Sequence, residues 1–283
     1  MRVVAQLDGT LVDPEAPLLR PDDYSVQRGD GVFETIFVVN RRTRELGPHL
    51  ARLARSAQLL GMPPVDIPAW ERVGQVVIDA WPWDTHPEMG LKLIYTRGAE
   101  YGDGSPTGFA MGIPIPDSTI DKRRNGVAAL TLDRGYGTDL TERAPWLLLG
   151  AKTLSYAVNM AATRYAQEHG AEEVIFTASD GTVLEGPTST VVIAKDRTLV
   201  TTPPPLGILE GTTQAALFRA AEAAGWKTKV EPITVPELSE ADGLWCVSSV
   251  RLITRVHTLN GEPLRDFSDL HKEVTSLYEA VYA

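Results

Sequence analysis

One lysine stands in a sequence context that suits covalent chemistry. Lys152 follows the apolar residues 146–149 and a Gly-Ala pair, and Leu154 comes two positions later. An ammonium is costly to remove from water, so a lysine in apolar surroundings has a lowered pKa and is neutral part of the time. A neutral amine can attack an aldehyde and later act as a general base. The alternative is a lysine that extends from a strand end to water.

A carboxylate further along the chain could face a positively charged ring nitrogen. Glu185 ends the strand-like residues 182–185 and precedes a loop of small polar residues at 186–190. An anion at this place would keep a heteroaromatic nitrogen protonated, which makes the ring a better acceptor of electrons. A surface glutamate before a turn explains the same pattern equally well.

Two other segments carry groups that suit a phosphate. Gly211, Thr212 and Thr213 begin a predicted helix, where free N–H groups and hydroxyls could bind an anion. Arg52 lies on another predicted helix, near Arg55, and could reach the same phosphate as a charged clamp. Helix capping would also account for the first pattern, and an exposed basic face for the second.

Other common chemistries find little support in the sequence. Cys246 lies in an apolar run and is expected to be a small buried hydrophobic residue rather than a nucleophile. The 5 histidines have no metal-ligand spacing, and we expect no metal site. The pair Ser248-Ser249 lacks the Gly-x-Ser-x-Gly pattern of serine hydrolases.

The bulk composition is that of an ordinary globular protein. A formal net charge of −10, with scattered Lys and Arg, argues against a nucleic-acid partner. The single cysteine excludes an intramolecular disulfide and fits a reducing compartment. No stretch approaches the roughly 20 apolar residues that span a bilayer, and no basic-then-apolar leader begins the chain. We therefore expect a cytoplasmic protein without a membrane partner.

The sequence predicts a mixture of helices and strands that would position these residues. Asp8-Gly9 between apolar segments predicts a hairpin at 3–12, and β-branched and aromatic residues predict a strand at 32–39. Leu50, Leu53 and Ala57 have helical spacing, which predicts a helix at 48–60. Further helices are predicted at 69–80, 155–169, 212–224 and 267–282, and further strands at 90–95, 108–115, 126–132, 173–177, 182–185, 189–194, 229–235, 243–248 and 255–259.

A proline-rich stretch divides the chain. Pro114 and Pro116 fix φ and remove ladder donors, which predicts a linker at 117–125 between an N-terminal α+β domain at 1–116 and a C-terminal domain at 126–283. The mixture of helices with many hairpin signals favours an α+β or mixed α/β fold over a doubly wound parallel sheet.

Five motifs, taken together and in order, resemble the fold-type IV enzymes that depend on pyridoxal 5′-phosphate (PLP). These enzymes comprise branched-chain aminotransferases, D-amino-acid transaminases and 4-amino-4-deoxychorismate lyases. The resemblance covers nearly the whole chain, and the combination is specific although each motif alone is not. The motifs are Gly29-Asp30-Gly31-Val32-Phe33-Glu34-Thr35, His49-Leu50-x-Arg52-Leu53, Lys152-Thr153-Leu154-Ser155-Tyr156, Leu184-Glu185-Gly186 and Gly211-Thr212-Thr213.

The resemblance implies roles for these residues. Lys152 would form a Schiff base with PLP, and Glu185 would pair with the pyridine nitrogen. A small α+β N-terminal domain and a larger, barrel-like C-terminal α/β domain would hold PLP between them, as in D-amino-acid aminotransferases, in a homodimer. The residues expected to bind the cofactor besides these two are Arg52, Thr188, Gly211, Thr212, Thr213 and Ser249.

The chain departs from the family pattern at two places. The family often has Ser-Ser-Asn after the Glu-Gly pair, where this chain has Thr188-Ser189-Thr190, and Gly-Ile-Thr where this chain has Gly211-Thr212-Thr213. Both changes keep small or hydroxyl-bearing groups, so the phosphate contacts that the resemblance implies survive.

Residues near the N-terminal strands favour the lyases. Branched-chain enzymes typically read Phe-Glu-Gly where this chain has Phe33-Glu34-Thr35, and the Arg-x-His carboxylate trap of D-amino-acid transaminases is absent between Arg97 and Pro106. The lyases convert 4-amino-4-deoxychorismate to 4-aminobenzoate and pyruvate in folate synthesis. The alternative is an aminotransferase acting on D-amino or branched-chain amino acids. Candidates for binding the small amino substrate are Phe33, Thr35, Lys92, Arg97 and Tyr156, although a solvated strand end explains Lys92 or Arg97 equally well.

Overall fold

The chain forms two compact units in the computed structural model, which describes residues 1–282. The first unit contains Met1–Pro116 and Ala151–Tyr156, and the second contains Asp117–Gly150 and the chain from Ala157 onward. The chain passes from the first unit to the second after Pro116, and the predicted domain ranges stay a prediction. Residues 117–125, predicted as a linker, form helix α4 (Asp117–Asn125) of the second unit. The segment with Lys152 belongs to the first unit, which sequence order alone does not indicate.

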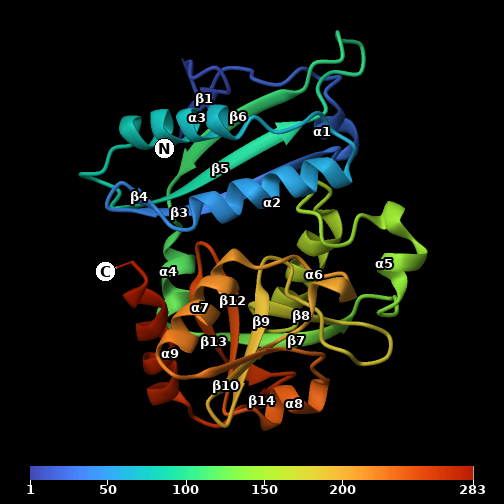
Figure 1. The fold of residues 1–283 in the computed structure, drawn as a ribbon, viewed down its shortest axis with the longest axis vertical. Helices are drawn as coiled ribbons and strands as arrows, with labels where there is room; N and C mark the ends of the chain where they lie inside the picture. Colours follow the sequence, from blue (N-terminus) through green and yellow to red (C-terminus); the bar gives the residue numbers. More distant parts are fainter. Residues whose placement is uncertain (283) are drawn as a thin grey trace. The chain divides into compact units, whose positions relative to one another are not determined.

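The first unit is built on a six-stranded antiparallel sheet with the order β2-β1-β6-β5-β3-β4 (Figure 1). The predicted hairpin at 3–12 is β1 and β2. The strands are β1 (Val3–Gln6), β2 (Leu11–Val12), β3 (Gly31–Val39), β4 (Arg42–Thr43), β5 (Glu88–Thr96) and β6 (Thr107–Ile113).

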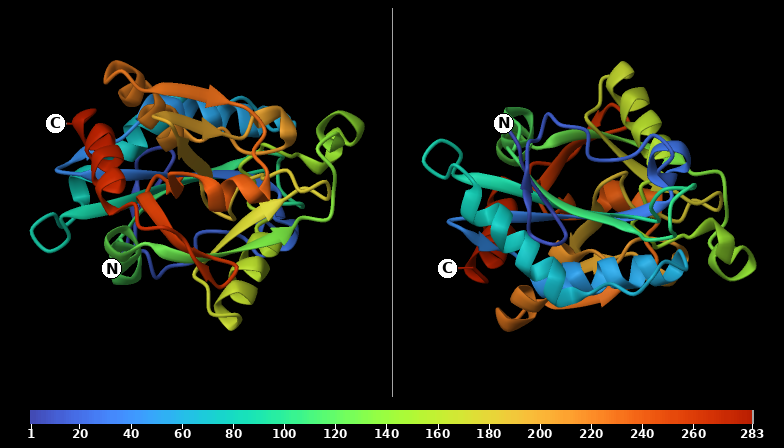
Figure 2. Two further views of the ribbon diagram at one scale, coloured as in Figure 1. Left: turned by 90° about the horizontal axis from the view of Figure 1, so that it is seen from below. Right: turned by 90° about the horizontal axis from the view of Figure 1, so that it is seen from above.

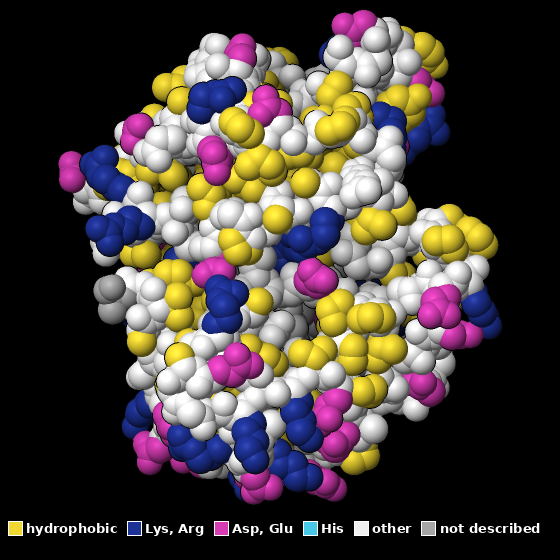
Figure 3. Space-filling view, in the orientation of Figure 1, with side chains coloured by type: hydrophobic (Ala, Val, Ile, Leu, Met, Phe, Trp, Pro, Cys, Tyr) yellow, Lys and Arg dark blue, Asp and Glu magenta, His cyan; other side chains and the backbone are white. Residues whose placement is uncertain are grey.

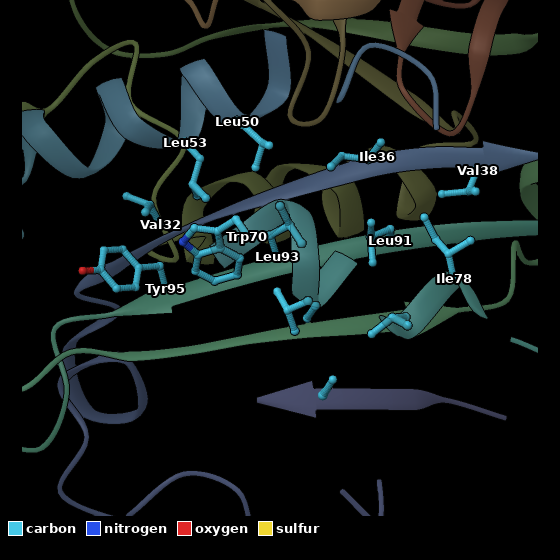
Figure 4. Close-up of a cluster of buried hydrophobic side chains, with 14 of the residues drawn as sticks. Val32, Ile36, Val38, Leu50, Leu53, Trp70, Ile78, Leu91, Leu93 and Tyr95 are labelled. Atoms are coloured by element: carbon cyan, nitrogen blue, oxygen red, sulfur yellow. The ribbon is translucent and has the colours of Figure 1, made fainter. Parts of the chain in front are cut away.

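Two long helices, α2 (Leu46–Leu59) and α3 (Ile67–Ala80), cover one face of this sheet. Figure 4 shows Leu50 and Leu53 of α2 beside β3, and Trp70 of α3 between Tyr95 and Leu93 of β5. Side chains alternate along a strand, so Phe33 and Thr35 lie on the opposite face of β3. The short helix α1 (Tyr24–Arg28) precedes β3 and ends at Gly29, whose φ of 69° is left-handed.

The second unit contains a larger mixed sheet with the order β11-β10-β9-β12-β13-β7-β8, to which β14 adds beside β13. β7 runs parallel to β8 and β13, and β10 runs parallel to β11, while the remaining pairs are antiparallel. The strands are β7 (Val127–Asp133), β8 (Glu173–Thr177), β9 (Thr190–Lys195), β10 (Thr198–Thr201), β11 (Lys227–Val230), β12 (Gly243–Ser248), β13 (Leu252–Leu259) and β14 (Glu262–Pro263).

Helices of the second unit pack on this curved, half-barrel sheet (Figure 2). α7 (Thr212–Ala223) packs against α9 (Ser268–Ala280), and both bury side chains around Trp245 of β12. α6 (Ala157–Glu168) packs on β8. The other helices are short, α5 (Leu140–Arg143) and α8 (Val235–Glu240), and α8 begins with a capping box of Thr234 and Glu237.

The fold confirms the predicted mixed α/β class. Acidic and basic side chains are interspersed over the face drawn in Figure 3. Within residues 1–282 no helix combines the length and apolarity needed to cross a bilayer. Cys246 is fully buried, which raises the pKa of its thiol to about 12, as expected of a small hydrophobic core residue.

Candidate functional site

The backbone of Lys152 is fixed on both of its polar groups. Its N–H donates to Ser56 Oγ of α2 at 3.0 Å, and its carbonyl accepts from the Phe33 N–H of β3 at 3.1 Å. One step further along, the Leu154 N–H donates to the Gly31 carbonyl at 2.8 Å. Residues 152–154 thus pair with the start of β3, which fixes the position of the Lys152 backbone and hence the origin of its side chain.

Aromatic rings surround the Lys152 amine within the first unit. Its Nζ lies 4.5 Å from the centre of the Phe33 ring and 5.8 Å from that of Tyr156, and these two rings meet edge to face at 5.3 Å. Ring faces attract a cation and exclude water. The structure therefore brings three of the predicted residues together.

A second lysine shares the ring of Phe33. Lys92 of β5 lies opposite Thr35 of β3, and its Nζ is 5.7 Å from the centre of the Phe33 ring. Burial lowers the pKa of Lys92. The amines of Lys92 and Lys152 thus lie beside one aromatic ring, and Thr35 lies on the same face of β3 as that ring.

Arg52 is buried in α2 together with a carboxylate and an imidazole. Its Nε and Nη2 donate to the two oxygens of Glu34, each at 2.7 Å, and His49 Nδ1 lies 2.7 Å from Glu34 Oε2. Burial would raise the pKa of Glu34, but the Arg52 charge and the hydrogen bonds from Arg52 and His49 hold it well below its usual range. The carboxylate fork fixes the plane of the Arg52 guanidinium.

His49 is held in its neutral form. Burial lowers its pKa, and the hydrogen bond and charge of Glu34 only partly oppose this effect. Because Glu34 is ionised and can only accept, the proton of neutral His49 must be on Nδ1. Sequence reasoning did not assign roles to Glu34 or His49, although the alternation of β3 places Glu34 on the helix-covered face, which is unusual for a charge.

Arg97 makes a structural ion pair. Its Nε and Nη2 donate to the Asp30 carboxylate at 2.6 and 3.1 Å, and Nη2 also donates to the Leu60 carbonyl at 2.7 Å. These bonds join the start of β3 to the end of α2. The predicted role of Arg97 in binding a substrate carboxylate stays a prediction.

Glu185 is positioned within the second unit by pairing with β8. The Phe176 N–H donates to its carbonyl at 2.9 Å, and the Leu209 N–H donates to its Oε2 at 3.0 Å. Residues 182–185 make only isolated bridges here, not the predicted strand. The phenol of Tyr136 is close enough that burial and the Glu185 charge raise its pKa against the influence of Arg134.

The start of α7 has the properties of an anion site. Gly211 occupies the N-cap without a side-chain hydrogen bond, and Thr212 and Thr213 are buried directly after it. A Cβ on Gly211 would come within 2.3 Å of Thr190 Oγ1, so only glycine fits. Because its N-cap residue is a glycine, which supplies no capping side chain, the start of α7 is a helix N-terminus of the kind that suits an anion.

Ser249 and Thr188 lie in two further loops of the second unit. Ser249 directly follows β12, and Thr188 Oγ1 accepts from Arg251 Nη2 at 2.9 Å. With Glu185 and the start of α7 they make up the predicted cofactor residues of this unit. Their roles, like those of Lys152 and Arg52, stay predictions.

The residues present fit PLP. A lysine beside aromatic rings suits attachment of an aldehyde, a carboxylate suits a ring nitrogen, and a helix start beside hydroxyls suits a phosphate. Four residues to which sequence reasoning gave no role bind predicted residues or one another, namely Glu34, His49, Arg251 and Glu173. PLP supplies a conjugated ring that takes up the electrons of a broken bond.

Comparisons with known proteins agree with this geometry. The family model described as amino-transferase class IV matches residues 31–259. A bifunctional aminodeoxychorismate lyase / D-amino acid transaminase from Mycobacterium tuberculosis is 47% identical over 269 residues, which cover 93% of either chain. A solved structure of a hypothetical aminotransferase from M. tuberculosis, in its PLP-bound form, superposes with a TM-score of 0.96 at 46% identity, covering 99% of this chain and 98% of that one.

A transaminase of fold IV from Curtobacterium pusillum gives a TM-score of 0.93 at 38% identity, and the match covers 99% of this chain and 98% of that chain. Sequence and structure comparisons thus extend over nearly the whole length of the protein and of its relatives. The chain belongs to the class IV aminotransferase family and is a PLP-dependent enzyme of fold type IV.

Proposed function

We propose that this enzyme is a lyase that converts 4-amino-4-deoxychorismate to 4-aminobenzoate and pyruvate, a step of folate synthesis. The observation that carries the proposal is the 47% identity, over 93% of both chains, to a relative whose name includes aminodeoxychorismate lyase. The Phe33-Glu34-Thr35 pattern and the lysine opposite Thr35 support it from the chain itself.

Lys152 is proposed to carry PLP and to move the proton of the reaction. With PLP bound, the Lys152 amine would act as the base that removes the proton from the amine-bearing ring carbon of the substrate. The carboxylate of Glu185 is proposed to keep the pyridine nitrogen protonated. The proposed phosphate contacts are Arg52, Thr188, Gly211, Thr212, Thr213 and Ser249.

Lys92 is proposed to recognise a carboxylate of the substrate. The substrate has two carboxylates, and an ammonium that lies beside Phe33 and is partly desolvated gains much from an anion. Thr35 opposes Lys92 and would add a hydroxyl to the same place. Tyr156 is proposed to contact the bound molecules beside Lys152.

A second candidate is the transfer of amino groups between D-amino acids and 2-oxo acids. The same M. tuberculosis relative has D-amino acid transaminase in its name. Both reactions begin with removal of a proton by the same lysine, so one set of residues can serve both. Transfer from branched-chain amino acids is the weaker form of this alternative, because Thr35 stands where branched-chain enzymes typically have glycine.

The experiment that tests both activities uses the purified holoenzyme. It is mixed with 4-amino-4-deoxychorismate, and fluorescent 4-aminobenzoate is followed; in parallel, pyruvate is measured after addition of D-alanine and 2-oxoglutarate. We expect 4-aminobenzoate from the wild type and at least about 100-fold less from Lys152→Ala. The exposed Lys272→Ala serves as the matched control. Transfer from D-alanine without any 4-aminobenzoate would overturn the lyase proposal.

Cytoplasmic location and a homodimeric state are also proposed, on the resemblance and on the single cysteine, which is free and buried. Size-exclusion chromatography with light scattering tests the dimer. A mass of one chain at micromolar concentration would contradict it.

A further inference from the structure

A buried ion pair in the second unit joins two loops that carry proposed cofactor residues. Arg251 lies between β12 and β13, two positions after Ser249. Its Nη1 pairs with Glu173 Oε2, and its Nη2 donates to Thr188 Oγ1 at 2.9 Å. The side chains of Arg251 and Glu173 are only 11% and 4% exposed. One guanidinium thus contacts the loop after Glu185 and the first residue of β8.

The acidic partner is itself held rigidly. Glu173 Oε1 accepts from the Val174 N–H at 3.0 Å, where β8 begins. The loop after Glu185 lies directly over this point, because a Cβ on Gly186 would come within 2.9 Å of the Val174 carbonyl and 2.3 Å of Ser189 Oγ. The Gly186 N–H closes the loop by donating to the Ser189 carbonyl at 2.8 Å. Glu173 therefore offers Arg251 a fixed anchor below the loop.

The turn that carries Ser249 is tied on its other side as well. Arg123 of α4 donates to the Val250 carbonyl, from Nε at 2.8 Å and from Nη2 at 2.5 Å. Thr254 Oγ1 donates to the Arg251 carbonyl at 2.9 Å. The hydrogen bonds to the carbonyls of Val250 and Arg251 fix the backbone of this turn. The direction of the Arg251 side chain therefore determines where the Thr188 loop lies relative to Ser249.

We propose that Arg251, anchored by Glu173, is a positioning residue that holds the Ser249 turn and the Glu185 loop in the register needed to bind PLP. This inference rests on the proposed roles of Ser249, Thr188 and Glu185 in cofactor binding. A buried ion pair adds little net stability compared with apolar residues of the same size, because both charges lose their hydration. The pair instead fixes orientation, because the planar guanidinium of Arg251 contacts Glu173 on one segment and Thr188 on another at the same time.

Removing the charges of Arg251 and Glu173 together distinguishes an effect of lost charge compensation from an effect of lost positioning. Arg251→Met alone leaves Glu173 buried without its partner and is expected to lower the melting temperature. The double variant Arg251→Met/Glu173→Leu removes that penalty. We expect its apoprotein to melt close to the wild type, yet to bind PLP at least about 10-fold more weakly, with a faster release of PLP. The exposed pair in the same unit, Lys229→Met/Glu231→Leu, is the matched control and should change neither quantity.

Dissociation constants come from titration of each apoprotein with PLP, followed by tryptophan fluorescence and by visible absorbance. Arg251→Lys is the second variant; it keeps the charge paired but can no longer hold both acceptors, so we expect PLP affinity between wild type and double variant. Wild-type PLP affinity in the double variant, or in Arg251→Lys if the double variant does not fold, would overturn the proposal. Failure of the wild type itself to retain PLP would instead count against the cofactor assignment, and is measured first.

Discussion

The fully buried carboxylate of Glu34 is the charge to which Arg52 and His49 bind. Glu34 is completely buried, and it stays ionised because Arg52 and His49 both donate to it. Without a charged neighbour, such burial would favour the protonated form of Glu34. The Glu34 carboxylate and the Arg52 guanidinium therefore each stabilise the charge of the other. Arg52 can present a fixed set of N–H groups to a phosphate only while Glu34 is charged.

Removal of this charge is the first prediction. Glu34→Gln leaves Arg52 buried without its counter-ion, and we expect unfolding free energy to fall by about 3–5 kcal/mol. Urea unfolding of the apoprotein measures the change, with the exposed Glu71→Gln on α3 as control. Because the pKa of Glu34 is lowered in the folded state, its contribution is present above its ordinary value and is lost as the pH falls below it. An unchanged urea midpoint in Glu34→Gln would contradict the argument.

The second prediction concerns Lys92. Lys92→Met keeps the stem that packs beside Phe33 but removes the ammonium. If Lys92 binds a substrate carboxylate in the ground state and in the transition state alike, KM for 4-amino-4-deoxychorismate should rise at least about 10-fold while kcat changes much less. Steady-state kinetics with Arg72→Met as the exposed control measure both constants. A loss confined to kcat would show that Lys92 does not serve as a simple carboxylate contact.

At the scale of elements, the C-terminal helix is tied to the sheet through a histidine. The Trp245 indole of β12 donates from Nε1 to His271 Nδ1 of α9 at 3.1 Å, and Phe267 meets the indole ring edge to face at 5.5 Å. Burial, and secondarily the charge of Arg255, lowers the pKa of His271. Protonation would put a second donor opposite the indole N–H and break this bond.

A fall in pH should destabilise the protein through His271. A histidine whose folded-state pKa is lowered binds its proton more readily when unfolded, so stability falls as the pH drops below about 6.5 toward the folded-state pKa. His271→Asn keeps an acceptor for Trp245 and should reduce the dependence of the urea midpoint between pH 5 and pH 7.5, leaving the part that His49, with its own lowered pKa, contributes. The exposed His257→Asn should leave that dependence as in the wild type. An equal slope in both variants would exclude His271 as its source.

Elements with strong periodicity could be predicted from the sequence, and elements fixed by tertiary contacts could not. Leu50, Leu53 and Ala57 predict α2 because their spacing matches its buried face. The prolines at 114 and 116 predict a break, but not that the following charged residues 117–125 would form α4. Val235 was predicted to end a strand and instead begins α8, because the capping box of Thr234 competes with strand pairing.

The same distinction holds for the site. Residues with a motif of their own, such as Lys152 and Glu185, could be named in advance. Their partners could not, because Glu34, His49 and Arg251 act through contacts between segments far apart in the chain. Buried charge in an otherwise apolar strand is the one signal that could have identified Glu34 beforehand.

At the scale of the whole molecule, cofactor binding and stability should be linked. The residues proposed to bind PLP come from both units: Lys152 and Arg52 from the first, and Glu185 and the start of α7 from the second. A ligand that binds only the folded protein stabilises it by about 2.7 kcal/mol at 100 times its dissociation constant. If both units contribute contacts, both should gain stability.

The fourth prediction is therefore that PLP raises the melting temperature of the apoprotein in proportion to the logarithm of its concentration, and slows amide hydrogen exchange in both units. Calorimetry measures the first effect, and exchange followed by mass spectrometry of peptides from α2 and α7 measures the second. Lys152→Ala should keep the protection of α7 and lower that of α2 only in part, because the attachment in the first unit is removed while the proposed phosphate contact of Arg52 on α2 remains. Protection confined to α7 in the wild type would mean that the first unit does not bind the cofactor, and that Lys152 and Arg52 have been assigned wrongly.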